Sequence, residues 1–285
     1  MLFNEDKFAF MRYSNKANLL TLPEYKGPNG SIIETNHTVS DLGILMSDNL
    51  SFKDHINKVQ RNSSKYCSWI LRTFKTRNKE TMKLLWTTYV QPHIDYCSQL
   101  WAPTKIGDLN TIEKLQQEFT RKISEISHLD YWERLKYLNM YSQERRFERY
   151  VIIYIWKAIE GIVTNFGIIP YHSTRHGRLC RVPPIINRSN PNIKTLRENS
   201  IKTRGPKLFN SLPPTIRNMS NCSTESFKYK VDSYLKHIPD QPRIPNYTRF
   251  CNASSNSIID MKSFSEDHLS SPSDSLNHGG VFDLA

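Results

Sequence analysis

The chain has little glycine and few cysteines, and it contains no long apolar run. Only 10 of its 285 residues are glycine and no Gly-x-x-x-x-Gly-Lys segment occurs, so a phosphate-binding loop of that type is excluded. No stretch reaches the roughly 18 apolar residues of a membrane-spanning helix. The five cysteines are odd in number and none belongs to a Cys-x-x-Cys pair, which predicts neither a disulfide framework nor a zinc ribbon.

Patterns typical of catalytic or metal-binding sites are also missing from the sequence. There is no Gly-x-Ser-x-Gly segment, and the adjacent acid pairs Glu5-Asp6 and Glu266-Asp267 are not flanked by strand-forming apolar residues. The four-residue spacing of His172, His176 and Cys180 would align three zinc ligands on a helix, but the neighbouring arginines and glycine favour a basic loop. We therefore predict no catalytic residue and no metal ligand.

Basic residues are abundant and concentrated in two segments. Lys and Arg number 39 against 27 acids, a net charge of +12 and an isoelectric point near 9.4. Residues 51–80 contain eight basic and two acidic side chains, and residues 171–240 contain thirteen and four. This balance favours a polyanionic partner, and nucleic acid is the first candidate.

The first basic segment is also the most regular. Apolar and small residues recur from Ile56 to Phe74 at spacings of three and four, which predicts a helix that begins near Ser51 and packs against helices in 80–125. The opposite face is basic, and its cations are expected to be exposed and to contact a phosphate backbone. Tyr66 and Trp69 flank this face and would stack on bases or pack in a core or interface. The predicted nucleic-acid-binding residues are Lys58, Arg61, Lys65, Arg72, Lys75 and Arg77.

The remaining pattern predicts a mainly α protein with a small N-terminal antiparallel β element. Residues 8–13 alternate, and residues 39–46 are β-friendly around Gly43. Helices are expected within 80–100, kinked or broken at Pro92, from 108, over 143–160 and over 224–237, with prolines interrupting the chain between 170 and 214. Residues 241–285 are rich in Ser and Asn, so a disordered tail without packed contacts after about 248 is expected.

Several phrases, in order, resemble the reverse transcriptases of non-LTR retrotransposons of the jockey or LINE type. The resemblance runs from about residue 7 to 248. The phrases include Asp41-Leu-Gly-Ile-Leu45, Leu50-Ser-Phe-Lys-Asp-His-Ile56, Tyr89-Val-Gln-Pro-His-Ile-Asp-Tyr-Cys97, Trp101-Ala-Pro103 and Leu208-Phe-Asn-Ser-Leu-Pro213.

The resemblance implies a division of the chain. Residues 1–50 would be the end of the palm, with Leu42 and Gly43 in a hairpin like a primer grip; 51–125 would be a helical thumb and 126–170 a helical extension. A basic, proline-interrupted region at 171–240 and the tail at 241–285 would follow. The aromatic-Ala-Asp-Asp catalytic turn of the family is absent, so no cofactor is expected in this chain, and Mg²⁺ would belong to the missing palm site.

These observations lead to one hypothesis and two alternatives. The chain is expected to be a truncated reverse transcriptase (RNA-directed DNA polymerase) fragment that binds an RNA–DNA hybrid or duplex backbone without sequence specificity. It could instead be one piece of an active polymerase completed by an upstream segment, or a repurposed helical protein-interaction module. The N-terminus has acids where a signal peptide needs positive charge, so the protein is expected to be intracellular, nuclear or cytoplasmic, with no membrane partner.

Overall fold

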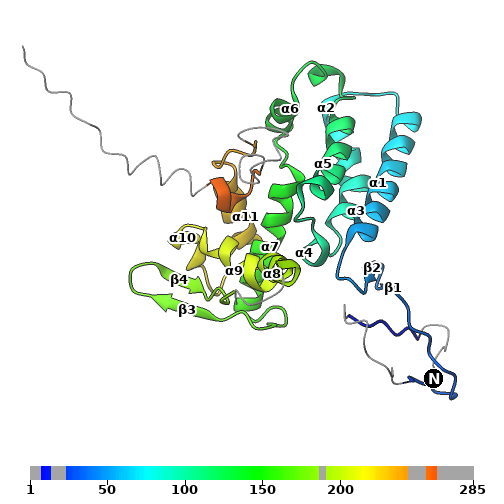
Figure 1. Cartoon of the computed structure of the whole chain (residues 1–285). Coiled ribbons are helices and arrows are strands. Elements are labelled where there is room, and N and C mark those ends of the chain that lie inside the picture. Colours follow the sequence, from blue (N-terminus) through cyan, green and yellow to red (C-terminus); the bar gives the residue numbers. More distant parts are fainter. Residues whose placement is uncertain (1–7, 14–23, 186–190, 243–254, 262–285) are drawn as a thin grey trace, which may run out of the picture.

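The computed structural model describes residues 8–13, 24–185, 191–242 and 255–261, and it is mainly helical (Figure 1). A two-stranded antiparallel sheet near the N-terminus precedes the helices, which confirms the predicted fold class. None of the described helices is long and apolar enough to cross a membrane.

The N-terminal sheet is a tight hairpin of β1 (Thr38–Asp41) and β2 (Ile44–Ser47). Asp41 pairs with Ile44, so Leu42 and Gly43 form a two-residue turn, with φ of 46° and 86°. Positive φ at both positions is the geometry that matches the twist of paired strands. The hairpin expected around Gly43 is therefore confirmed. The strand expected at 8–13 is not, because within it only Phe10 pairs, as an isolated bridge.

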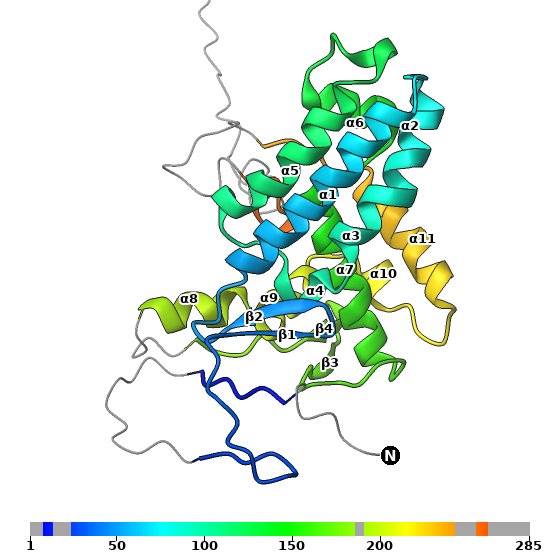
Figure 2. The same ribbon diagram turned by 90° about the vertical axis from the view of Figure 1, so that its right-hand side faces the viewer.

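The first hydrophobic cluster lies among the helices that follow the hairpin. Its side chains come from one face of the 21-residue helix α1 and from the helices beside it, as the spacing of apolar residues predicted. Figure 2 shows α1 across the near side of this bundle, with the hairpin at its lower end. The elements are α1 (Lys53–Thr73), α2 (Lys79–Leu85), η2 (Trp86–Val90), α3 (Gln91–Asp95), α4 (Ser98–Trp101) and α5 (Ile106–Thr120).

The break expected near Pro92 is confirmed, although its form was not predicted. A five-residue π-helical segment, η2, ends at Val90, and Pro92 then lies in the first turn of α3. Proline is tolerated there because the first turn of a helix needs no amide donor. The indole of Trp86 donates a 2.7 Å hydrogen bond to the Gln91 side chain across this junction.

One long helix, α7 (Gln143–Ile159), belongs to two hydrophobic clusters. Its Phe147 packs into the first cluster, whereas Ile152, Ile155 and Trp156 pack into the second. The short helix α6 (Tyr131–Leu138) precedes α7. A capping box between Asp130 and Glu133 stabilises its N-terminus.

The second cluster gathers the elements after α7. Trp156 stacks on Phe227 with ring centroids 4.4 Å apart and planes 8° apart. The elements are β3 (Pro170–Ser173), β4 (Gly177–Cys180), α8 (Pro191–Asn199), α9 (Ile201–Asn210), α10 (Pro214–Arg217) and α11 (Thr224–Leu235).

Helix α9 continues through Pro206, contrary to the interruption expected there. Gly205 and Pro206 are both buried. A Cβ on Gly205 would lie 2.6 Å from Ile155 Cδ1 of α7, so the absent side chain permits the close approach of the two helices. Packing against α7 compensates for the backbone hydrogen bond that proline removes.

The expectation that nothing after about residue 248 packs is wrong for residues 255–261. Asn256, Ser257 and Ile258 are buried against α7. The amide of Asn256 donates to Glu144 at 3.1 Å and that of Ile258 donates to Glu148 at 2.9 Å. Two carboxylates more than a hundred residues away therefore supply the partners that composition could not indicate. Residues 243–254 and 262–285 of the predicted tail lie outside the described residues.

Candidate nucleic-acid interface

The candidate interface is the outer face of α1, where four cations form what we call the basic row: Lys58, Arg61, Lys65 and Arg72. Arg61, Lys65 and Arg72 are exposed and Lys58 is half-buried. Four of the five buried residues of the same helix, Ile56, Val59, Ser63 and Ile70, lie on its other face. The predicted opposition of the two faces is confirmed.

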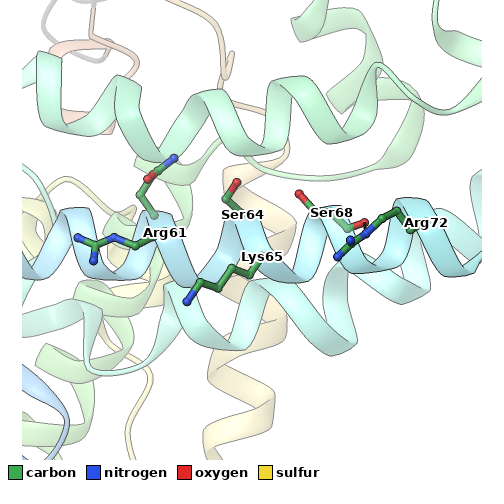
Figure 3. A pocket seen from close by; sticks show the side chains of 6 residues that line it. Arg61, Ser64, Lys65, Ser68 and Arg72 are labelled. Atoms are coloured by element: carbon green, nitrogen blue, oxygen red, sulfur yellow. Dashed lines mark hydrogen bonds between the residues drawn. The ribbon is translucent and has the colours of Figure 1, made fainter.

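The basic row has no internal counter-charge in the ranges that the structure describes. None of the ion pairs there includes any of its four side chains. Arg72 Nε donates to the carbonyl of Ser68 at 3.3 Å. Figure 3 shows Arg61, Ser64, Lys65, Ser68 and Arg72 following one another along the helix, where they help line a shallow hollow of about 300 Å³. Cations and hydroxyl groups together match the acceptors of a phosphate backbone.

Two of the predicted residues lie off this face. Helix α1 ends at Thr73, so Lys75 is exposed beyond the helix rather than on it. Arg77 turns back and donates to the carbonyls of Leu71, at 2.6 Å, and Phe74. Those carbonyls end the helix without an intrahelical partner, so Arg77 closes the C-terminus of α1. Spacing alone could not locate this helix end.

Hydrogen bonds from Lys58 and Tyr96 hold the hairpin at the N-terminal end of the basic row. Lys58 Nζ donates to the carbonyl of Gly43 at 3.1 Å, and the Tyr96 hydroxyl donates to that of Leu42 at 2.9 Å. The Leu42 side chain is 81% exposed at the hairpin tip. Leu42 and Gly43, the residues predicted for a primer-grip-like hairpin, therefore lie at a turn that is hydrogen-bonded to Lys58 of the basic row.

His55, which no sequence pattern singled out, holds β2 against α1. Its Nδ1 accepts the Leu45 amide at 3.2 Å, and its ring packs edge-on against Trp101 at 5.1 Å. Burial, assisted by the nearby Lys58, lowers the pKa of His55 to about 4. The imidazole is consequently neutral at physiological pH, as the accepting Nδ1 requires.

Half-exposed rings border the basic row, and we call them the aromatic edge: Tyr66, Trp69, Tyr89 and His93. Trp69 meets Tyr89 edge-on at 5.4 Å, and Tyr66 stacks on His93 at 4.5 Å with planes 18° apart. Trp69 also meets Phe74 edge-on at 5.9 Å. The rings come from α1, η2 and α3, so tertiary packing and not sequence spacing brings them together.

In the second basic segment, residues 171–240, several arginines are engaged in ion pairs or hydrogen bonds within the fold and are not available to an external ligand. Arg178 pairs with Glu160 at 2.5 Å, and Arg204 pairs with the buried Glu148 at 3.1 Å. Arg217 donates to the carbonyls of Arg178 and His176 at 3.1 and 2.9 Å. These arginines hold the interior of the second cluster together.

Two acids of α5 and α7 are engaged in contacts within the fold: Glu113 is half-buried and Glu144 is buried. Glu113 accepts hydrogen bonds from the Tyr131 hydroxyl and the Gln143 amide, and burial raises the pKa of Glu113 to about 8. Burial and the adjacent Glu148 raise the pKa of Glu144 to about 7. Carboxyl groups whose protonated form is favoured are poor ligands for hard cations.

The structure brings no metal-binding group together in the ranges it describes. His172 and Cys180 lie on opposite strands of the β3–β4 hairpin, with His176 at its turn, so the helix that would have aligned them is absent. Cys180 is buried, and this burial raises the pKa of its thiol to about 11.

Comparison with known proteins gives partial similarities. No protein-family model matches the chain, and no solved structure matches it. A stretch of 107 residues is 27% identical to the uncharacterized protein B0403.1 of Caenorhabditis elegans, covering 36% of this chain and 54% of that protein. A stretch of 99 residues is 27% identical to the RNA-directed DNA polymerase from mobile element jockey of Drosophila funebris, covering 34% of this chain and 11% of the polymerase.

The chain thus spans about half of the nematode protein and about a tenth of the jockey polymerase. Part of it is similar to a retrotransposon polymerase. This similarity supports a reverse-transcriptase-related origin, in agreement with the resemblance in the sequence.

Proposed function

We propose that the chain is a non-catalytic fragment of a non-LTR retrotransposon reverse transcriptase, and that it holds the phosphate backbone of nucleic acid with the basic row. The observation that carries this proposal is the set of four cations on one outer helix face that have no ion-pair partner among the described residues. The partial similarity to the jockey polymerase supports the same function. The sequence contains no aromatic-Ala-Asp-Asp turn, which supports the absence of a catalytic centre.

The spacing of the cations suits a long polyanion. Lys58 and Arg72 are fourteen residues apart, which is about 21 Å along the axis of an α-helix. Like charges at this density repel one another, and a phosphate backbone laid along the helix removes that repulsion while releasing its own counterions. Contacts of this kind are made to phosphates and not to base edges, so binding does not depend on sequence. The proposed ligands are RNA–DNA hybrid and duplex.

A charge-reversal experiment tests this function. The variant Arg61→Glu/Lys65→Glu/Arg72→Glu leaves Lys58 in place because Lys58 also fastens the hairpin. We expect its affinity for an RNA–DNA hybrid to fall by more than about tenfold, and the slope of log K against log salt to decrease by about three. Fluorescence anisotropy titrations at several salt concentrations measure both quantities.

The matched control carries the same change of charge elsewhere. Lys202, Lys207 and Lys230 are exposed on α9 and α11, so Lys202→Glu/Lys207→Glu/Lys230→Glu alters net charge equally without touching the row. We expect this control to retain the salt slope of the wild type. Equal losses in both triple variants, or unchanged binding in the first, would contradict a role for the basic row.

A further inference from the structure

We propose that the aromatic edge binds unpaired bases of the strand whose phosphates lie on the basic row, so that the preferred ligand is a single-stranded segment adjoining a duplex. This inference rests on the proposed function and adds a class of ligand to it. It concerns the exposed surface of Tyr66, Trp69 and Tyr89, which the proposed contacts with the phosphate backbone do not use.

Trp69 lies between the cations and not apart from them. It follows Lys65 by four positions and precedes Arg72 by three, and residues at these spacings are neighbours on a helix surface. A nucleotide with its phosphate on either cation therefore has its base within reach of the indole. Charge and ring are arranged as in sites that hold single strands.

The rings are held in place while they stay partly exposed. Trp69 is 40% exposed, Tyr66 38% and Tyr89 41%. Phe74 and Tyr89 meet the Trp69 ring edge-on, and His93 stacks on Tyr66, so these contacts limit ring rotation. A ring that is already fixed loses little conformational entropy when it binds.

Unpaired bases are the occupants that fit this surface best. A paired base inside a duplex is covered on both faces by its neighbours, whereas an unpaired base offers a free face for stacking. The flanking cations select a ligand that carries one negative charge per base. An apolar protein surface would use the rings but would leave the adjacent cations without counter-charge.

The experiment compares three ligands built on the same short RNA–DNA hybrid: the blunt hybrid, the hybrid with an unpaired extension of about six nucleotides, and the hybrid with an abasic extension of equal length. The abasic extension keeps the phosphates and removes the bases. We expect the wild type to bind the base-bearing extension at least about tenfold more tightly than the abasic one, because stacking on an aromatic side chain contributes this much per base.

Variants then assign the preference to Trp69. Trp69→Leu is expected to bind both extensions equally, while its affinity for the blunt hybrid stays within about twofold of the wild type. Trp69→Phe keeps a ring and is expected to retain part of the preference. Tyr229→Leu removes an exposed ring from α11 and is expected to retain all of it. Far-UV circular dichroism and urea unfolding confirm that each variant is folded.

The outcomes separate this inference from the proposed function. Equal binding of the base-bearing and abasic extensions by the wild type, with the blunt hybrid still bound, overturns the inference alone. The same holds if Trp69→Leu keeps the full preference, a result that would show that the bases bind elsewhere. If none of the three ligands binds, the proposed function fails together with the inference.

Discussion

At the scale of single residues, the proton on His55 decides how firmly the hairpin is held. Nδ1 accepts the Leu45 amide only when the imidazole is neutral, and the folded protein keeps it neutral because burial lowers its pKa. The hairpin carries Leu42 and Gly43 beside the basic row, so this hydrogen bond links the protonation of a buried ring to the shape of the candidate interface.

We predict that stability decreases as the pH falls from about 6.5 to about 4, the pKa values of His55 in the unfolded and folded chain. In this interval the unfolded state binds the proton and the folded state does not, so the loss of stability amounts to about 3 kcal/mol. Urea unfolding at a series of pH values measures it. His55→Gln keeps a neutral acceptor that does not titrate. The free energy of unfolding of the wild type should therefore approach that of the variant as the pH falls toward 4. Parallel curves of this free energy against pH would show that His55 is not the titrating group.

At the scale of elements, the contact between α7 and α9 depends on a missing side chain. The distance of 2.6 Å from a Cβ placed on Gly205 to Ile155 Cδ1 leaves no room for a methyl group, and both residues are buried. Glycine inside a helix usually costs stability relative to alanine, so its presence at this position reflects packing and not backbone conformation.

We predict that Gly205→Ala destabilises the protein by about 1–3 kcal/mol, because overpacking outweighs the gain in helix propensity. Chemical denaturation gives the free energy of unfolding. Ile155→Val removes the nearest atom, so Gly205→Ala combined with Ile155→Val should cost less than the sum of the two single changes. Additive costs would show that the two helices separate freely at this point.

Elements whose residue pattern is local could be predicted from the sequence. Elements whose position depends on contacts with residues far away in the chain could not. The two faces of α1 follow from spacing alone, and the β1–β2 turn follows from residues that lie side by side in the chain. By contrast, the docking of Asn256 depends on Glu144, and the course of α9 through Pro206 depends on α7. Arg77 matched the charge pattern, yet it closes a helix because the end of α1 places it there.

At the scale of the whole molecule, the charged side chains of α7 connect the parts of the fold. Arg146 forms a bidentate pair with Asp95 of α3, with contacts of 2.6 to 3.1 Å, and Arg149 pairs with Asp232 of α11. Arg145 is fully buried and donates to the carbonyls of Pro239 and Asn256 at 2.9 and 2.8 Å. Asp95 and Asp232 are thus engaged in ion pairs that hold the helices together.

We predict that the purified chain does not incorporate nucleotides on a primed RNA template with Mg²⁺ or Mn²⁺. Two-metal transfer requires carboxylates that are free to bind both ions. Asp95 is engaged by Arg146, Asp130 caps α6 through the Glu133 amide at 2.9 Å, and Glu113 has a raised pKa. Primer extension above that of a mock preparation, abolished by Asp41→Asn or Asp95→Asn, would contradict the prediction.

Because α7 packs into both hydrophobic clusters, the coding sequence cannot be divided within this helix without harm to both products. A gene split or an exon boundary within residues 143–159 would leave one product without the surface that covers Phe147 and the other without the surface that covers Trp156. Each product would then expose apolar side chains and tend to aggregate. The segments before and after this helix are therefore expected to be inherited together, and a recombination event that exchanges only one of them has to preserve both sides of α7.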